Sequence, residues 1–388
     1  MIAVRKPSES LRAVLKAFSL LCKVMGVDAI DPKYHFNFFT ALSILYLTAY
    51  HVCTLYTAFQ HRDDFGFMLQ VLCTIGAGML GVVKLGTVLK YSKILGAMRT
   101  LIEHLYTEYE MQGTDFRRAL YNSCNSSKKI IKAVSFSYVF LIFTILVPPF
   151  SIMAINGQRQ VILLYDVPGL NITTNFGYIT ITTIHTINVI TCAIGFLTTD
   201  IFVLLFLSQS YLFVNVFKVK VKEFNESVTF AKNRFIPATE KALEDLLKWH
   251  TLYLSYTRTC NNIFFIPVTV QVVLTTFSIT LTLYVILTSY WLGAYSFLGL
   301  MAVNLYILCI MGTKVENCND EFCFEIYNIS WYNLTVAQQK TVKLMLLQSQ
   351  SPNVITIASV MPLSVSSAMK ITKGIYSIFM MMVQLLVE

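Results

Sequence analysis

Charged side chains are scarce in this chain of 388 residues, of which only 13% are Asp, Glu, Lys or Arg. An ordinary soluble domain carries about 25%. Signatures of catalysis are missing too: there is no glycine-rich phosphate loop, no H-E-x-x-H motif and no G-x-S-x-G motif. Paired carboxylates such as Asp63-Asp64 lie between apolar runs and are typical of solvated loops. The sequence therefore predicts neither an enzyme nor a cofactor or metal site.

The N-terminal segment and the cysteines argue against a cleavable signal peptide and a disulfide framework. Residues 1–33 are basic and lack an apolar core followed by a small-residue cleavage site, so we expect the first membrane span to target the chain. The nine cysteines lie in apolar runs or in loops that we place in the cytosol, so a disulfide framework is not expected. The net charge of +9 lies between the apolar runs, a membrane pattern that argues against a nucleic-acid partner.

Long apolar runs are what the sequence has in abundance, with 55% hydrophobic residues. A helix needs about 20 apolar residues to cross a bilayer, and in lipid each backbone polar group must bond within the helix. The sequence therefore predicts an all-α integral membrane protein with seven transmembrane helices. The expected spans are Phe36–Phe59, Phe65–Leu89 (interrupted by Lys84), Ala133–Ile155 (with a Pro148-Pro149 bend), Gly177–Phe217, Ile263–Ser289, Leu292–Gly312 and Leu363–Val387.

Positive charge alternates between the loops. One set of alternate loops carries 24 Lys and Arg residues, leaving aside Lys132 at the edge of a span, whereas the other set carries only Arg62 and Arg159. Because cytoplasmic loops are enriched in Lys and Arg, this predicts a cytosolic N-terminus and an extracellular C-terminus, the reverse of a G-protein-coupled receptor. Asn171-Ile172-Thr173 is then a glycosylation acceptor in the one sizeable outer loop.

The last span carries a polar stripe. Its members Ser366, Lys370, Lys373, Ser377, Met381 and Gln384 recur every three or four residues and share one helical face. Such a stripe faces a protein interior or water rather than lipid. It is either a pore wall, in which Ser377, Met381 and Gln384 contact the conduction path, or a helix-packing face whose lysines reach the cytosolic headgroups.

The C-terminal third resembles the insect odorant receptor family in Ser330-Trp331-Tyr332-Asn333, Val336–Gln350, Met361-Pro362-Leu363-Ser364 and Tyr376-Ser377-Ile378-Phe379, as does Leu243–Thr259. The resemblance implies a subunit of a ligand-gated, non-selective cation channel, a tetramer in the plasma membrane of a sensory dendrite. It implies the variable, odorant-binding subunit, because the co-receptor's long cytosolic insertion is absent, and it implies assembly with that co-receptor.

The resemblance also divides the chain. Residues 1–35 would be a cytosolic segment, 36–312 the first six spans with an odorant pocket in their outer half, 313–362 a cytosolic anchor, and 363–388 the pore-lining helix. The anchor would use Trp331, Tyr332, Leu344 and Leu347. Small volatile ligands favour a mostly apolar pocket, for which we select Leu72, Ile75, Gly76, Met79, Ser137, Phe140, Thr144, His185, Val189, Thr276, Thr280 and Tyr284.

Three alternatives stay open. Ordinary helix packing also uses small and aromatic residues, so each selected position has a purely structural interpretation. A gustatory-type channel that works without the co-receptor shares this architecture, although Tyr376-Ser377 argues against it. A transporter would show internal repeats and discontinuous helices, and neither is visible in the sequence.

Overall fold

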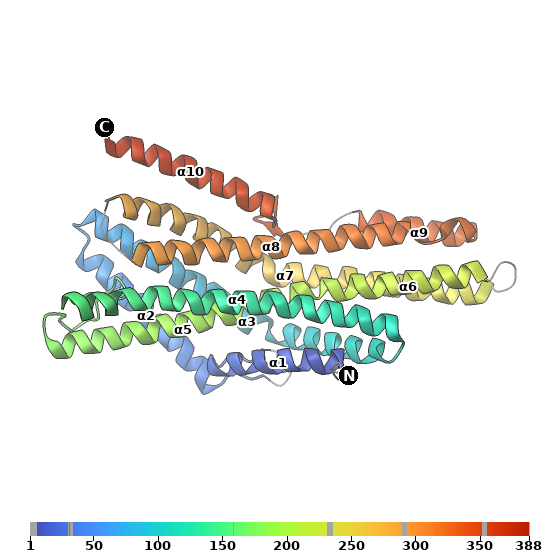
Figure 1. Cartoon of the computed structure of the whole chain (residues 1–388), viewed down its shortest axis with the longest axis horizontal. Coiled ribbons are helices and arrows are strands. Elements are labelled where there is room, and N and C mark those ends of the chain that lie inside the picture. Colours follow the sequence, from blue (N-terminus) through green and yellow to red (C-terminus); the bar gives the residue numbers. More distant parts are fainter. Residues whose placement is uncertain are drawn as a thin grey trace.

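The computed structural model describes residues 6–29, 31, 34–157, 159–230, 236–288, 293–350 and 355–387 and is almost entirely helical within these ranges (Figure 1). Its elements are α1 (Pro7–Val24), α2 (Phe38–Gln60), α3 (Phe65–Glu110), α4 (Thr114–Asn156), α5 (Asn175–Ser208), α6 (Ser210–Phe230), α7 (Ile236–Thr288), α8 (Gly293–Tyr327), a 3-10 turn (Trp331–Asn333), α9 (Val336–Ser349), β1 (Thr356–Ile357), β2 (Met361–Pro362) and α10 (Val365–Val387).

Six helical segments among the described residues are long and apolar enough to cross a membrane: α2, α3, α4, α5 together with α6, α7 and α8. The seventh expected span corresponds to α10, whose 23 residues reach about 35 Å at 1.5 Å per residue. That length exceeds the hydrocarbon core of about 30 Å. The prediction of an all-α membrane protein is confirmed.

Most of the helices continue well beyond the predicted spans. Helices α3, α4, α7 and α8 have 46, 43, 53 and 35 residues, whereas a bilayer needs about 20. The fourth apolar run is divided at Gln209 into α5 and α6. The predicted end of the fifth span, Ser289, and the predicted start of the sixth, Leu292, lie outside the described residues.

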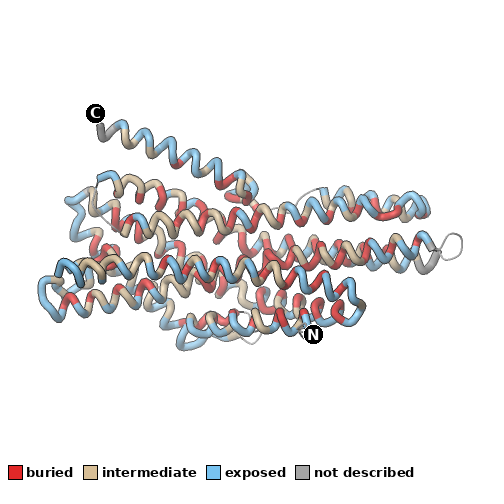
Figure 2. Tube along the Cα trace, viewed as in Figure 1, coloured by how far each residue is buried: buried red, intermediate tan, exposed pale blue. Residues whose placement is uncertain are grey.

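An aromatic cluster joins α6 to α7 and α8. Phe217 and Phe322 stack with their ring centroids 4.1 Å apart, and the Trp249 indole donates a hydrogen bond of 2.9 Å to the carbonyl oxygen of Phe213. Buried residues, red in Figure 2, follow the inward faces of these helices, whereas α10 is mostly exposed. The packed core therefore extends through α6 and the parts of α7 and α8 beside it, and α10 contributes little to it.

Local contacts fix where α10 departs from the bundle. A Cβ added to Gly312 of α8 would lie 2.0 Å from the Leu363 carbonyl oxygen, so only glycine permits this close approach. The backbone N–H of Val365 then donates to Thr313 Oγ1 at 2.8 Å. From this junction α10 runs away from the other helices (Figure 1), and one long face of it is exposed over much of its length.

Candidate functional site

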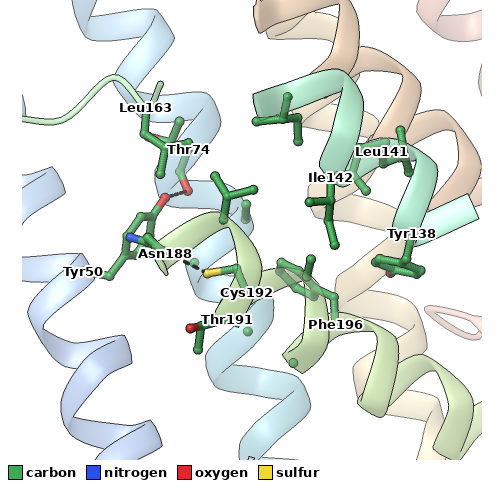
Figure 3. Close-up of a pocket in the computed structure, with 18 of the residues that line it drawn as sticks. Tyr50, Thr74, Tyr138, Leu141, Ile142, Leu163, Asn188, Thr191, Cys192 and Phe196 are labelled. Atoms are coloured by element: carbon green, nitrogen blue, oxygen red, sulfur yellow. Dashed lines mark hydrogen bonds between the residues drawn. The ribbon is translucent and has the colours of Figure 1, made fainter. Parts of the chain in front are cut away.

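A cavity of about 220 Å³ lies between α2, α3, α4, α5 and the beginning of α8 (Figure 3). Its walls are mainly carbon, from side chains such as Leu141, Ile142, Ile145 and Phe196. An engineered apolar cavity of about 150 Å³ holds one benzene molecule. By proportion, this cavity accommodates roughly nine non-hydrogen atoms, the size of a small volatile compound.

Small residues on α3 create the hollow. Ala77, Gly78 and Gly81 face the cavity from one side of the helix. A Cβ on Gly81 would lie 3.5 Å from the Leu47 side chain, an ordinary contact, whereas one on Gly78 would lie 2.7 Å from Tyr50. Gly78 therefore allows α2 to approach α3, and the missing side chains leave space between these helices and α5.

The segment between α4 and α5 covers the cavity. Residues Gln160, Val161, Ile162 and Leu163 line it, and the buried His185 holds this cover in place. The backbone N–H of Leu163 donates to His185 Nδ1 at 3.3 Å, and His185 Nε2 lies 3.2 Å from the Tyr165 carbonyl oxygen. Nδ1 therefore accepts and Nε2 donates, the pattern of a neutral imidazole.

Most polar groups in the wall are already bonded within the protein. The Tyr50 hydroxyl donates to the Thr74 carbonyl oxygen at 2.8 Å, and Ser43 donates to the Met25 carbonyl oxygen at the same distance. Thr144 donates to the Leu141 carbonyl oxygen at 2.9 Å, and Cys192 lies 3.0 Å from Asn188 Oδ1 (Figure 3). The wall therefore offers a ligand mainly apolar contact.

One end of the cavity is charged. Lys84 of α3 forms an ion pair with Asp200 of α5, and their side chains are only 4% and 3% exposed. The Tyr138 hydroxyl of α4 contacts Asp200 Oδ2 and lies 2.7 Å from Asn304 Oδ1 of α8. Because a hydroxyl carries one proton, it donates to one of these oxygens at a time. This polar cluster joins four helices, and Lys84 and Tyr138 also line the cavity.

The structure places two of the twelve predicted pocket residues, Thr144 and Val189, in this cavity. The other ten, namely Leu72, Ile75, Gly76, Met79, Ser137, Phe140, His185, Thr276, Thr280 and Tyr284, do not line this cavity. On α3, Leu72 and Met79 are exposed on the outside and Gly76 packs on Ser278 of α7.

Exposure and helix packing also keep predicted residues of the other helices out of the cavity wall. Phe140 is 58% exposed on the outer side of α4, while its neighbours Leu141 and Ile142 line the cavity. Helix α7 lies behind α3, and Thr276 and Thr280 bond to its own backbone carbonyl oxygens. His185 lies one layer behind the wall and holds the cover.

Sequence reasoning missed the polar cluster, although a signal was present. Lys84 is the one charged residue in the second predicted span, and Asp200 is the one Asp, Glu, Lys or Arg in the fourth. Ionisable groups within membrane segments are costly and usually functional. A search for opposite charges at similar depth would have paired them.

The remaining predicted positions lie on free surfaces. Ser377, Met381 and Gln384 are exposed on α10, together with Ser366, Lys370 and Lys373 of the same stripe. The anchor residues Trp331, Tyr332, Leu344 and Leu347 are also exposed, and Asn171 is exposed between α4 and α5. Two large faces of the chain therefore lack a partner among the described residues.

Comparison with known proteins gives consistent similarities. The family model described as 7tm Odorant receptor matches residues 64–376. The chain is 29% identical to Putative odorant receptor 83c of Drosophila melanogaster over 98% of its own length and 99% of that protein. Its fold is similar to that of the olfactory receptor OR5 from Machilis hrabei in complex with eugenol, with a TM-score of 0.78, 13% identity, and coverage of 97% of this chain and 99% of that chain. The structure of OR5 described without eugenol gives a TM-score of 0.76 at 12% identity.

Proposed function

The chain belongs to the 7tm odorant receptor family, and on that basis we propose that it is the odorant-binding subunit of a ligand-gated, non-selective cation channel. In this proposal it assembles with the family's co-receptor as a hetero-tetramer in the plasma membrane of a sensory dendrite. Its N-terminus lies in the cytosol, as the loop charges predict. A small volatile molecule opens the pore from within the chain's own transmembrane bundle.

The observation that carries the proposal is the covered, mostly apolar cavity among α2, α3, α4, α5 and α8. Small-molecule sites are concave, largely apolar and supplied with few polar groups. The cavity has these properties, and its volume suits a ligand of about nine non-hydrogen atoms. We assign it as the odorant pocket, in place of the residues that do not line it.

A chain of contacts supports coupling between this pocket and the last helix. Tyr138 lines the cavity and lies 2.7 Å from Asn304 of α8. Two residues further along α8, the Tyr306 hydroxyl lies 2.9 Å from Thr372 Oγ1 of α10. A ligand shifts a conformational equilibrium only by binding its states unequally. We propose that the ligand favours an arrangement of Tyr138 and α8 in which α10 moves.

The exposed stripe of α10 supports its assignment to the pore. Ser377, Met381 and Gln384 lie on the face that is turned away from the bundle, and in a tetramer this face would surround the central axis. The two lysines of the stripe lie nearer the cytosolic end and are not assigned to the filter. In the same proposal, residues 313–362 form the anchor, through the exposed aromatic and leucine side chains of the 3-10 turn and α9.

Whole-cell recording tests the proposal directly. The receptor is expressed with and without the co-receptor and exposed to a panel of volatile compounds. We expect currents carried by several cations, and only when both proteins are present. Odorant-evoked currents without the co-receptor would favour the gustatory-type alternative. Odorant responses without any conductance would contradict the channel proposal.

A further inference from the structure

The Lys84 ammonium group has unused hydrogen-bonding capacity at the cavity. Its nitrogen can donate three hydrogen bonds. Asp200 accepts one of them, and the Phe196 ring centroid lies 5.2 Å from Nζ. Among the residues that the structure describes, no second acceptor for Nζ is found. The side chain is 4% exposed and lines the cavity, so an acceptor that reaches it comes from within the cavity.

The surrounding wall makes this donor distinctive. The hydroxyl groups of Ser43, Tyr50 and Thr144 bond to backbone carbonyl oxygens, so they do not compete strongly for a ligand. Tyr46 and Thr191 also line the cavity, and the Tyr46 hydroxyl lies beside the Thr191 side chain. A charged donor forms stronger hydrogen bonds than a neutral phenol, so Lys84 is a stronger donor than the Tyr46 hydroxyl.

We propose that the odorant pocket selects neutral, mainly hydrocarbon ligands that carry one hydrogen-bond acceptor oxygen, such as a carbonyl oxygen, and that this oxygen binds Lys84 Nζ. This inference rests on the proposed function of the cavity as the odorant pocket. The hydrocarbon part of the ligand lies against Phe196 and Ile142. The specificity-determining group is therefore a lysine held at one end of an otherwise apolar cavity.

The charge of the cluster decides which oxygen compounds fit. Asp200 already balances the Lys84 charge, so a carboxylate ligand would enter a site without net positive charge and would approach the Asp200 carboxylate. An ammonium ligand would be repelled by Lys84 and offers no acceptor. A neutral acceptor avoids both penalties and satisfies an N–H that is costly to leave unpaired in a buried site.

Isosteric ligand pairs test the proposal on the full-length receptor. The probes are 2-octanone with 2-methyl-1-octene, and acetophenone with α-methylstyrene, in which a methylene group replaces the carbonyl oxygen. Each probe has nine non-hydrogen atoms, the size estimated for the cavity. Binding is measured by ligand-induced thermal stabilisation of the purified receptor in detergent micelles. The test variant is Lys84→Met with Asp200→Asn, which removes both charges together and keeps an acceptor for Tyr138.

We expect the wild-type receptor to bind each ketone at least about tenfold more tightly than its hydrocarbon partner, as a charge-assisted hydrogen bond permits. The double variant should bind both members of a pair equally while retaining its hydrocarbon affinity, which also shows that its pocket is folded. Tyr46→Phe should keep the ketone preference.

Three results would overturn the inference. One is equal binding of both members of each pair by the wild type. This result would refute the role of Lys84 but not the assignment of the cavity as the odorant pocket. Another is a ketone preference that survives in the double variant, or that disappears in Tyr46→Phe. The third is binding of none of the four probes by the wild type, which would also refute the assignment of the cavity as the odorant pocket.

Discussion

The buried ion pair between Lys84 and Asp200 predicts a distinctive stability pattern. Both side chains are almost fully buried, at 4% and 3% exposure. Removing one member of such a pair leaves a buried charge uncompensated and costs about 3–5 kcal/mol. At 1.4 kcal/mol per factor of ten, this lowers the folded-to-unfolded ratio by roughly two to three and a half powers of ten. Lys84→Met alone should therefore strongly destabilise the receptor.

Removing both charges should behave differently from the sum of the two single changes. Replacing a whole buried ion pair with neutral residues of similar size is often close to neutral. We expect Lys84→Met with Asp200→Asn to be within about 1–2 kcal/mol of the wild type, since Asn keeps an acceptor for Tyr138. The free energy of unfolding is measured by denaturant titration of the purified receptor in micelles.

A second ion pair supplies the control. Lys218 and Glu321 have the same chemistry, but their side chains are 34% and 47% exposed, so Lys218→Met should cost no more than about 1 kcal/mol. The reasoning is refuted if Lys84→Met costs as little as Lys218→Met. It is equally refuted if the double variant is destabilised by the sum of the two single changes.

Three other predictions address the cover, the anchor and the pore. His185→Ala removes two of the hydrogen bonds that hold the covering segment, so ligands of every class should dissociate faster in kinetic binding measurements; unchanged dissociation would refute the role of His185 in holding the cover. Trp331→Ala should reduce co-purification with the co-receptor, because a buried aromatic anchor contributes about 2 kcal/mol or more; unchanged assembly would remove it from the interface. Met381→Ala and Gln384→Ala should change ion permeability or blocker sensitivity modestly with every odorant, and a change confined to odorant ranking would contradict the pore assignment.

The membrane architecture could be predicted from the sequence because its causes are local. Apolar runs of bilayer length must form helices, and the seven predicted runs all correspond to helices in the structure. The continuation of α3, α4, α7 and α8 beyond the runs was less visible, because those segments are polar enough to resemble loops. The extensions of α7 and α8 pack through Trp249 and Phe322 against Phe213 and Phe217 of α6, so three segments far apart in the chain meet there.

The site was harder to predict, because membrane helices are apolar on every side. On α3, Leu72 and Met79 face outward, whereas Ala77 and Gly81 face the cavity. Both faces are apolar, so hydrophobicity does not separate them. On α4, Phe140 and Ile142 are both large and apolar, yet only Ile142 lines the cavity. The polar stripe of α10 was visible from sequence because its polar residues recur at the helical period.

The dose–response curves of Ile142→Ala and Phe140→Ala, recorded in cells that also express the co-receptor, test the central claim most directly. The two residues are neighbours on α4, but Ile142 lines the cavity and Phe140 is exposed outside it. We expect Ile142→Ala to shift potency unequally among odorants, by up to roughly ten- to a hundredfold for a loss of about 1–3 kcal/mol, with the reversal potential unchanged. Phe140→Ala should leave potency nearly unaltered. Potency shifts with Phe140→Ala and none with Ile142→Ala would contradict the assignment of this cavity as the odorant pocket.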